Sequence, residues 1–458
     1  MNYSPKPQFA SAPSAPPIAP APLQIAGARP WLSDERLVCI IIAASVCYQG
    51  VLCLINSTIM PLNRTLLGAA EAMILLMCFP LLLRRLLPGV VLLGVIAMVA
   101  LLTVWIFNQQ INIKSVRDLI MPLCFFWLGC NIGRPEVADR AFKLAIWVVL
   151  IMGLFEALLL DYYTRWFDIY TYYVNMGVMN TGADIFVRED KLMSNGMRPE
   201  GIGRTLLPQL LGPHRVSSVF LEPIAMGNFA TISAAWGLCR PASRWREGVF
   251  FVIAALVMMV LCDSRFALMS VTLLVIVRLL VSGPLLYMCV LTPLGAVALL
   301  LVMGYTTPNE TGMIISDDFH GRLAYSGWSL MKFDLPMLFG VGHTKTYYDE
   351  GYAHLLASFG LPLVLILWLS FWLLPVKDDA ALRFRALASI YIVLILCISG
   401  TSLFALKTSG ILWFLVGCSL LSPMAVPAIG NRLKYPTSVT PAVTSSSPSN
   451  NRSMSNAD

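Results

Sequence analysis

The chain contains few charged residues, because Asp, Glu, Lys and Arg together make up only 12% of its 458 residues. Soluble domains carry about twice that share, so the composition excludes a water-soluble globular protein. Hydrophobic residues make up 57% of the chain. This balance predicts a protein embedded in a lipid bilayer.

Two further absences narrow the functional classes. The eleven cysteines show no repeated CxxC or Cys/His spacing, so we interpret them as apolar packing residues and predict no zinc site. No Asp-x-Asp motif for a metal-bound nucleotide sugar stands in the long connections, where Asp317 and Asp318 are adjacent. We therefore expect no metal and no cofactor.

The net charge of +7 does not indicate nucleic acid as a partner. The basic residues fall in short clusters between apolar runs, where they orient a chain in the membrane. The Pro- and Ala-rich residues 1–36 lack the basic-then-apolar pattern of a cleaved signal peptide. We predict a disordered cytoplasmic tail there and a second, Ser-rich one over 429–458.

Between the tails, residues 37–428 form one predicted transmembrane domain. About 20 mainly apolar residues cross the hydrocarbon core, and about twelve segments meet that length, which predicts an all-α polytopic fold. The expected spans are Leu37–Ile55, Leu66–Leu83, Val90–Phe107, Val116–Ile132, Phe142–Leu160, Pro223–Leu238, Gly248–Cys262, Phe266–Leu280, Leu285–Tyr305, Ala353–Leu374, Arg383–Leu403 and Thr408–Pro427.

Lys and Arg concentrate in one alternate set of connections, which the positive-inside rule assigns to the cytoplasm. This set includes Arg84, Arg85 and the stretches 134–143, 240–246 and 377–385. The other set holds two long connections, about 161–222 and 306–352. We therefore expect two long periplasmic loops and both termini in the cytoplasm.

Four segments carry charged residues at or near the ends of expected spans, where membrane anchoring alone does not require them. In the first, "HRVSSVFLEPIAMGN", Arg215 is a candidate donor to a phosphate oxygen and Glu222 precedes Pro223, which suits the first position of a helix. The alternative is an interfacial Arg215 that reaches lipid headgroups while Glu222 caps a helix. In the second, Asp263 and Arg265 flank a tight turn, where they either bind substrate or neutralise each other.

The other two places lie in the second long connection. "DDFHGRLAYSGWSLM" offers His320 for proton transfer and Trp328 for stacking on sugar rings. A solvated amphipathic stretch is the alternative reading. "GVGHTKTYYDEGYAHLL" places Asp349 and Glu350 beside tyrosines just before the chain re-enters the membrane, where a carboxylate can act as a general base. His343 and His354 compete for that role or are structural.

In their order along the chain these pieces resemble the Wzy-type polysaccharide polymerases and the related O-antigen ligases. The motifs that carry the resemblance are "RVSSVFLEPIAMGN", "DSRFA", "GRLAYSGW" and "DEGYAHLLASFG". In related ligases a histidine stands at the distance from the final glycine where this chain has Asp349. This difference favours a polymerase.

The resemblance implies a metal-independent glycosyltransferase of the bacterial inner membrane, whose donor is a glycan on undecaprenyl pyrophosphate. Arg215, Arg265 and Arg322 are then expected to stabilise the leaving pyrophosphate, and Asp349, oriented by His320 or Glu222, to take the acceptor proton. We expect Arg204, Trp328, Tyr352 and His343 to bind substrate.

The expected pathway is exopolysaccharide, capsule or O-antigen synthesis, with membrane lipid, a flippase and a chain-length regulator as partners. Two other functions stay open at this point. One is an O-antigen ligase with the same site chemistry, and the other is a flippase or transporter of lipid-linked glycans. Transporters often consist of two similar halves, and we find no convincing half-to-half repeat.

Overall fold

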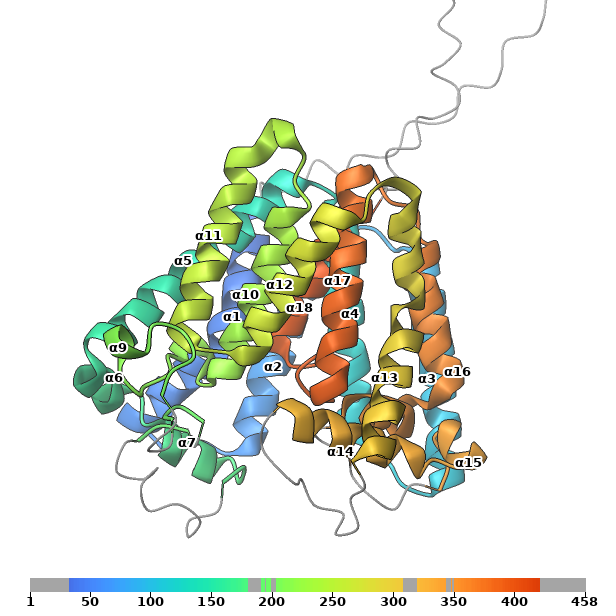
Figure 1. Ribbon diagram of the computed structural model, residues 1–458, viewed down its shortest axis with the longest axis horizontal. Coiled ribbons are helices and arrows are strands. Elements are labelled where there is room, and N and C mark those ends of the chain that lie inside the picture. The colour runs from blue at the N-terminus through green and yellow to red at the C-terminus, as the bar shows by residue number, and fades with distance from the viewer. Residues whose placement is uncertain are drawn as a thin grey trace, which may run out of the picture.

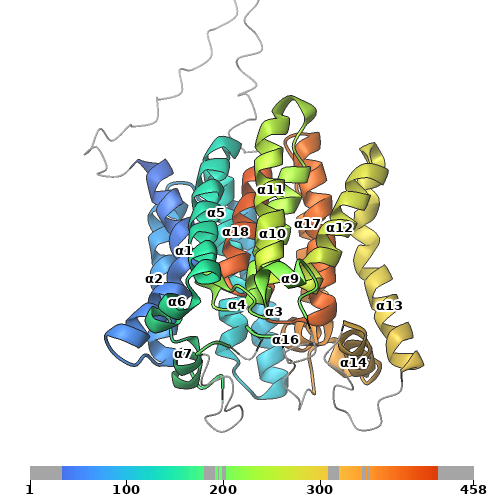
Figure 2. The ribbon, with the colours of Figure 1, turned by 60° about the vertical axis from the view of Figure 1, so that its left-hand side comes forward.

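A computed structural model describes residues 33–179, 191–193, 195–198, 203–307, 319–342, 347 and 350–420. The predicted tail 429–458, most of the predicted tail 1–36, and the candidate residues Asp349 and His343 lie outside these ranges. Within them every regular element is a helix, which confirms the all-α class. The helices run largely alongside one another in a single bundle (Figures 1 and 2).

The elements of the first half are α1 (Asp34–Thr58), α2 (Arg64–Leu83), α3 (Pro88–Asn108), α4 (Ile113–Ile132), α5 (Pro135–Leu158), α6 (Leu160–Trp166), α7 (Ile169–Asn175), α9 (Pro208–Leu211) and the 3-10 turn η1 (Ser218–Phe220). Those of the second half are α10 (Pro223–Leu238), η2 (Ala242–Arg244), α11 (Trp245–Cys262), α12 (Arg265–Leu280), η3 (Gly283–Leu291), α13 (Thr292–Thr306), α14 (Phe319–Met331), α15 (Leu335–Leu338), α16 (Gly351–Leu373), α17 (Asp379–Ile398) and α18 (Leu406–Ser419).

Nine helical segments of the described chain are long and apolar enough to span a membrane, so the protein is a multi-pass membrane protein. They are α1, α2, α3, α4, α5, η2 with α11, η3 with α13, α16 and α17. The other three expected spans overlap the shorter helices α10, α12 and α18, which have 16, 16 and 14 residues. Residues 421–427 of the last expected span lie outside the described residues.

Some helix boundaries differ from the expected spans because capping residues fix them. α17 begins at Asp379 rather than Arg383, since the Asp378 side chain accepts a hydrogen bond from Ala381 N–H and starts the helix there. α5 begins at Pro135, which occupies the first turn where a proline needs no N–H partner. The expected long loop 161–222 also contains the helices α6, α7, α9 and η1.

One end of the bundle gathers the basic connections, and we call it the basic end. Lys377 Nζ donates to Gly133 O at 2.6 Å and to Cys418 O at 2.5 Å, which joins the ends of α4, α16 and α18. Arg240 after α10 pairs with Asp139 in the first turns of α5. Further ion pairs at this end are Arg84–Asp34, Arg134–Glu35, Arg140–Glu35 and Arg244–Glu136.

The opposite end, which we call the loop end, holds the described parts of both long connections. Asn108 Nδ2 at the end of α3 donates to Gly340 O at 2.6 Å, and Lys407 at the start of α18 lies 3.2 Å from Glu222 at the start of α10. α6, α7, α14 and α15 lie at this end (Figure 1). Since α1 starts and α18 finishes at the basic end, the described chain enters and leaves the bundle on the same side.

The centre of the bundle is formed by α10, α17 and α18, most of whose residues are buried. α4 and α18 approach closely because each has a glycine at the contact. A Cβ atom on Gly129 would lie 2.2 Å from Phe414 O, and one on Gly417 would lie 2.2 Å from Phe126 O. Small residues of this kind let two helix backbones meet inside a membrane.

Candidate functional site

The chain between α9 and α10 is irregular but buried from His214 to Leu221. Non-helical backbone at membrane depth is tolerated only when its polar groups are satisfied by protein or by a wet cavity. The fully buried Glu156, near the end of α5, provides this satisfaction. Its carboxylate accepts hydrogen bonds from Ser217 N and Ser217 Oγ, each at 3.0 Å, and from Ser218 N at 2.5 Å.

The turn between α11 and α12 is organised by Asp263, which adopts a left-handed conformation with φ of 44°. Arg198 donates to its carboxylate through Nε at 3.1 Å and Nη2 at 2.7 Å. Thr205 N and Leu206 N donate to the same group. The alternative that Asp263 and Arg265 neutralise each other is therefore wrong, because the carboxylate is held by the first long connection instead.

These partners also set the protonation of Asp263. Burial alone raises the pKa of the carboxyl group, but the hydrogen bonds from Arg198, Thr205 and Leu206 outweigh it and hold the pKa below its usual value. The carboxylate is therefore ionised at neutral pH.

Arg204 and Arg215 are both buried beside this turn and cap the end of α11. Arg204 Nη2 donates to Val260 O at 2.6 Å and to Leu261 O at 2.7 Å. Arg215 Nε donates to Cys262 O at 3.2 Å. Cations at the carboxyl end of a helix are stabilised by its dipole, so both side chains contribute to the structure of the turn.

The gathering of arginines affects their charge. Burial, followed by the positive charge of Arg198, lowers the pKa of Arg215 to about 10. Arg215 therefore remains protonated at neutral pH. Its Nη1 donates to Asn195 O at 2.9 Å, which fixes the first long connection against the turn.

Arg265 differs from these two arginines because it is exposed. It is the first residue of α12, and its Nε lies 3.3 Å from the Thr205 hydroxyl. Arg198, Arg204, Arg215 and Arg265 thus converge on one turn, and we call these four residues the arginine cluster. A group of cations at the loop end can bind an anion such as a phosphate.

Glu222 belongs to a second group of side chains rather than to the arginine cluster. Its carboxylate lies 3.2 Å from Lys407 Nζ and accepts a hydrogen bond from Tyr173 OH at 2.7 Å. Lys407 is buried and also donates to Gln49 Oε1 at 2.8 Å. Glu222 itself is 30% exposed, so the pair faces open space on one side.

The group continues into α2 and α4. Tyr48 OH donates to Glu71 Oε1 at 2.9 Å, and Gln49 Nε2 lies 3.3 Å from the same hydroxyl. Arg117 Nη1 lies 3.5 Å from Glu71 Oε2. We call this set the α1–α2–α4–α18 network, and it comprises Tyr48, Gln49, Glu71, Arg117, Asp118, Tyr173, Glu222 and Lys407.

The third predicted group lies on α14. His320 is exposed at the start of the helix, and Arg322 and Trp328 are half-buried. Lys332 Nζ lies 3.3 Å from the centre of the Trp328 ring. The Tyr325 ring stacks on the same indole, with 6.2 Å between the ring centres. The Trp328 face is therefore already covered by this chain's own side chains.

The start of α16 forms the fourth predicted group. Tyr352 is buried, and its hydroxyl has no hydrogen-bond partner within the described ranges. His354 is also buried, with its Nδ1 2.8 Å from Tyr347 O. The start of α16 is therefore held to the second long connection through Tyr347.

The sequence-predicted residues do not form one contiguous set in the described chain. Arg204, Arg215 and Arg265 are brought together, whereas Glu222 is bound to Lys407. α14, with His320 and Arg322, stands on the other side of the loop end from α6 and α7 in both views (Figures 1 and 2). Asp349 and His343 lie outside the described residues.

Four residues that organise these groups escaped the sequence reasoning: Glu71, Glu156, Arg198 and Lys407. Three of them, Glu71, Glu156 and Lys407, lie in or next to expected spans. Ionisable residues in a span are costly unless paired and mark functional or structural sites, so this signal was available. Arg198 had no such signal, because it lies among many other charges in a long connection.

The described residues contain no group of three His, Cys, Asp or Glu side chains arranged to hold a metal ion. Comparison of the chain with protein-family models, with curated proteins and with solved structures found no match.

Proposed function

We propose that this protein is a polymerase of lipid-linked oligosaccharide repeat units, acting on the periplasmic face of a bacterial inner membrane. The observation that carries the proposal is the arginine cluster, in which residues from the first long connection and from the α11–α12 turn converge at the loop end. The resemblance of the motifs to Wzy-type polymerases supplies the substrate class, an undecaprenyl-pyrophosphate-linked glycan.

The proposed topology has twelve spans, with both long connections in the periplasm and both termini in the cytoplasm. α10, α12 and α18 would be the three short spans. A 16-residue helix is about 24 Å long, which is shorter than the hydrocarbon core of about 30 Å. The buried irregular segment from His214 to Leu221 would lengthen the α10 crossing. Non-helical backbone is tolerated inside a membrane when protein groups accept its hydrogen bonds, as Glu156 does here.

In the proposed reaction the acceptor hydroxyl oxygen attacks the anomeric carbon of the growing glycan. The bond from that carbon to the pyrophosphate oxygen breaks, and the configuration inverts. The exposed Arg265 is the cluster member best placed to stabilise the leaving pyrophosphate. Arg204 and Arg215 support it by holding the turn, and Arg322 on α14 is a further candidate donor.

The proton of the acceptor hydroxyl needs a carboxylate to receive it. Asp349 remains the proposed base on the strength of the motif resemblance. Glu222 is the alternative, because its carboxylate is partly exposed at the loop end, 3.2 Å from Lys407 Nζ. Tyr352, Trp328, His320 and His343 are assigned to substrate binding or orientation by the resemblance alone.

The test is extension of a lipid-linked repeat unit by the purified protein in detergent. We expect Arg265→Ala to lower the rate at least about a hundredfold, the typical loss of one transition-state donor, without changing the melting temperature. Arg246→Ala at the basic end is the matched control and should be fully active. Normal extension by Arg265→Ala would remove the arginine cluster from the mechanism.

The same assay separates the competing functions. A flippase or transporter would not lengthen the lipid-linked glycan in detergent. Deletion of the gene should shorten the polymer if the protein is a polymerase, whereas loss of a ligase would leave long chains on the carrier lipid.

A further inference from the structure

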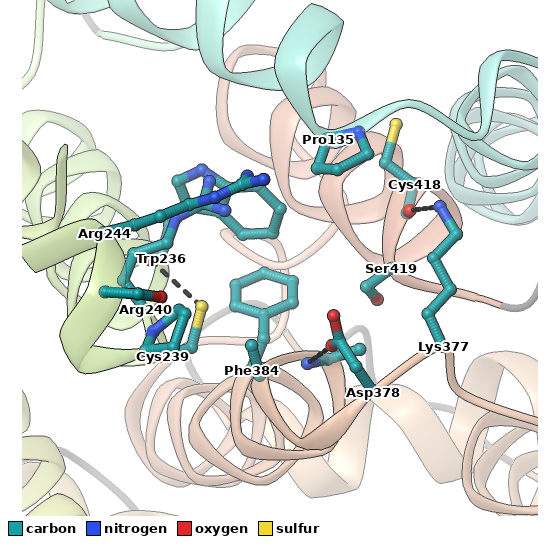
Figure 3. A pocket seen from close by; sticks show the side chains of 14 residues that line it. Pro135, Trp236, Cys239, Arg240, Arg244, Lys377, Asp378, Phe384, Cys418 and Ser419 are labelled. Atoms are coloured by element: carbon teal, nitrogen blue, oxygen red, sulfur yellow. Dashed lines mark hydrogen bonds between the residues drawn. The ribbon is translucent and has the colours of Figure 1, made fainter. Parts of the chain in front are cut away.

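A cavity of about 320 Å³ lies at the basic end of the bundle, at the opposite end from the arginine cluster. Figure 3 shows the side chains that line it. One wall is formed by the α10–α11 connection with Arg240 and Arg244, and the other by Lys377 and Asp378 between α16 and α17. Phe384 stands between the two walls. Three cations and one carboxylate thus line a cavity that the proposed reaction does not use.

Arg240 is a fixed and buried cation in this cavity. Its side chain is 7% exposed, it pairs with Asp139, and its guanidinium lies 4.3 Å from the centre of the Trp236 ring. Its Nε has no hydrogen-bond partner within the described ranges. A buried donor that is left unpaired is costly, so a ligand oxygen that reached it would be stabilised.

The opposite wall is also favourable for an anion. Lys377 Nζ donates to two backbone carbonyl oxygens, and the carboxylates of Asp378 and Glu136 attract it without forming an ion pair within the described residues. The Asp378 carboxylate is engaged by Ala381 N–H at 2.8 Å. Because Ala380, Ala381 and Ser243 line the cavity, the amino ends of α17 and of η2 with α11 both border it, and such ends carry partial positive charge.

The mouth of the cavity combines a cation with apolar surface. The Arg244 side chain is 47% exposed, and its Nη1 lies 3.9 Å from Glu136, which is longer than a hydrogen bond. On α11, which follows directly, Trp245, Val249 and Ile253 are exposed. Tryptophan is enriched where a membrane helix meets the headgroup region, and the two aliphatic residues follow at four-residue spacing along the same helix.

We propose that this cavity binds the phosphate of an anionic phospholipid, with Arg240, Arg244 and Lys377 around the headgroup and the acyl chains along the exposed face of α11. Basic pockets between membrane helices bind acidic headgroups in this way. Free inorganic phosphate would meet the same cations but would gain nothing from the apolar face. The two sources can therefore be separated by experiment.

The experiment uses the full chain purified in detergent, with phosphatidylglycerol, phosphatidylcholine or inorganic phosphate added. Bound lipid is counted by native mass spectrometry, and the melting temperature is followed in parallel. We expect phosphatidylglycerol to bind and to raise the melting temperature, and phosphatidylcholine and inorganic phosphate to have little effect. Arg244→Gln should weaken phosphatidylglycerol binding about fivefold, the contribution of one basic residue near an acidic headgroup.

Arg246→Gln is the matched control, because Arg246 is exposed two residues away but does not line the cavity. It should bind phosphatidylglycerol like the unchanged protein, and both variants should melt like that protein when no lipid is added. An equal loss of binding in both variants, or no loss in Arg244→Gln, would overturn the proposal. Equal stabilisation by inorganic phosphate would overturn the lipid assignment.

Discussion

At the scale of single residues, the arginine cluster depends on one carboxylate. Asp263 joins the α11–α12 turn to the first long connection through Arg198, Thr205 and Leu206. Its removal leaves Arg198 without its carboxylate partner in a site where the Arg198 side chain is only 13% exposed. Breaking a buried pair in this way is more costly than never having formed it.

We therefore expect Asp263→Asn to lower the free energy of unfolding by about 3 kcal/mol at pH 7. Because the folded state lowers the pKa of Asp263, its stabilising effect is present above the ordinary carboxyl pKa and is lost as the pH falls through the lower folded value. Melting curves of the two proteins should separate at pH 7 and approach each other as the pH falls below the ordinary carboxyl pKa. Equal melting temperatures at pH 7 would contradict this role.

Lys407 and Glu222 form the second residue-scale dependence, between the amino ends of α18 and α10. We expect Lys407→Met alone to destabilise the protein, since Glu222 loses its cation, and Lys407→Met with Glu222→Gln to recover part of the loss. The double-mutant cycle should give a coupling free energy of about 1 to 3 kcal/mol. Additive effects of the two substitutions would show that the pair is not energetically coupled.

At the scale of elements, the arrangement of the centre depends on the contact between α4 and α18. No side chain fits at Gly129 or Gly417, because a Cβ atom at either position would overlap a backbone oxygen of the facing helix. The nearly complete burial of α18 means that it has no room to move away.

We expect Gly417→Leu to lower the yield of monodisperse protein and its melting temperature severely. Gly94→Leu on α3 is the control, because nothing lies within 4 Å of a Cβ atom built there. The control should melt like the unchanged protein, measured in the same detergent. Normal melting of Gly417→Leu would show that the two helices are not in this contact.

At the scale of the whole molecule, the short basic connections and the two long connections lie at opposite ends of the bundle. The basic connections meet at one end through Lys377, Arg240 and the pairs to Asp34 and Glu35. The described parts of both long connections lie at the other. By the positive-inside rule the basic end is proposed to be cytoplasmic.

Cysteine labelling in spheroplasts checks this orientation. Ile111 at the loop end is 75% exposed, and Ser243 at the basic end is exposed. A membrane-impermeant thiol reagent should label Ile111→Cys in intact spheroplasts and Ser243→Cys only after permeabilisation. The reverse pattern would invert the orientation, and labelling of both would contradict the placement of these residues at opposite ends.

Much of the fold was predictable because hydropathy acts locally. A span needs only a run of apolar residues. Nine of the expected segments overlap helical segments of the described chain that are long and apolar enough to cross a membrane, and the other three overlap the shorter helices α10, α12 and α18. The boundaries were less predictable where a cap decides them. α17 begins at Asp379, four residues before the expected position, because the Asp378 side chain caps the helix there. Hydropathy does not detect such a cap.

The sequence alone determined that this chain is a membrane protein, that it is helical, and that its basic residues concentrate in alternate connections. Only the tertiary structure decided which charges meet. Asp263 binds Arg198 across 65 positions rather than its neighbour Arg265, and Glu222 binds Lys407 across 185 positions. Ion pairs depend on distance in space, which helix packing sets, whereas apolarity is a property that each segment carries with it.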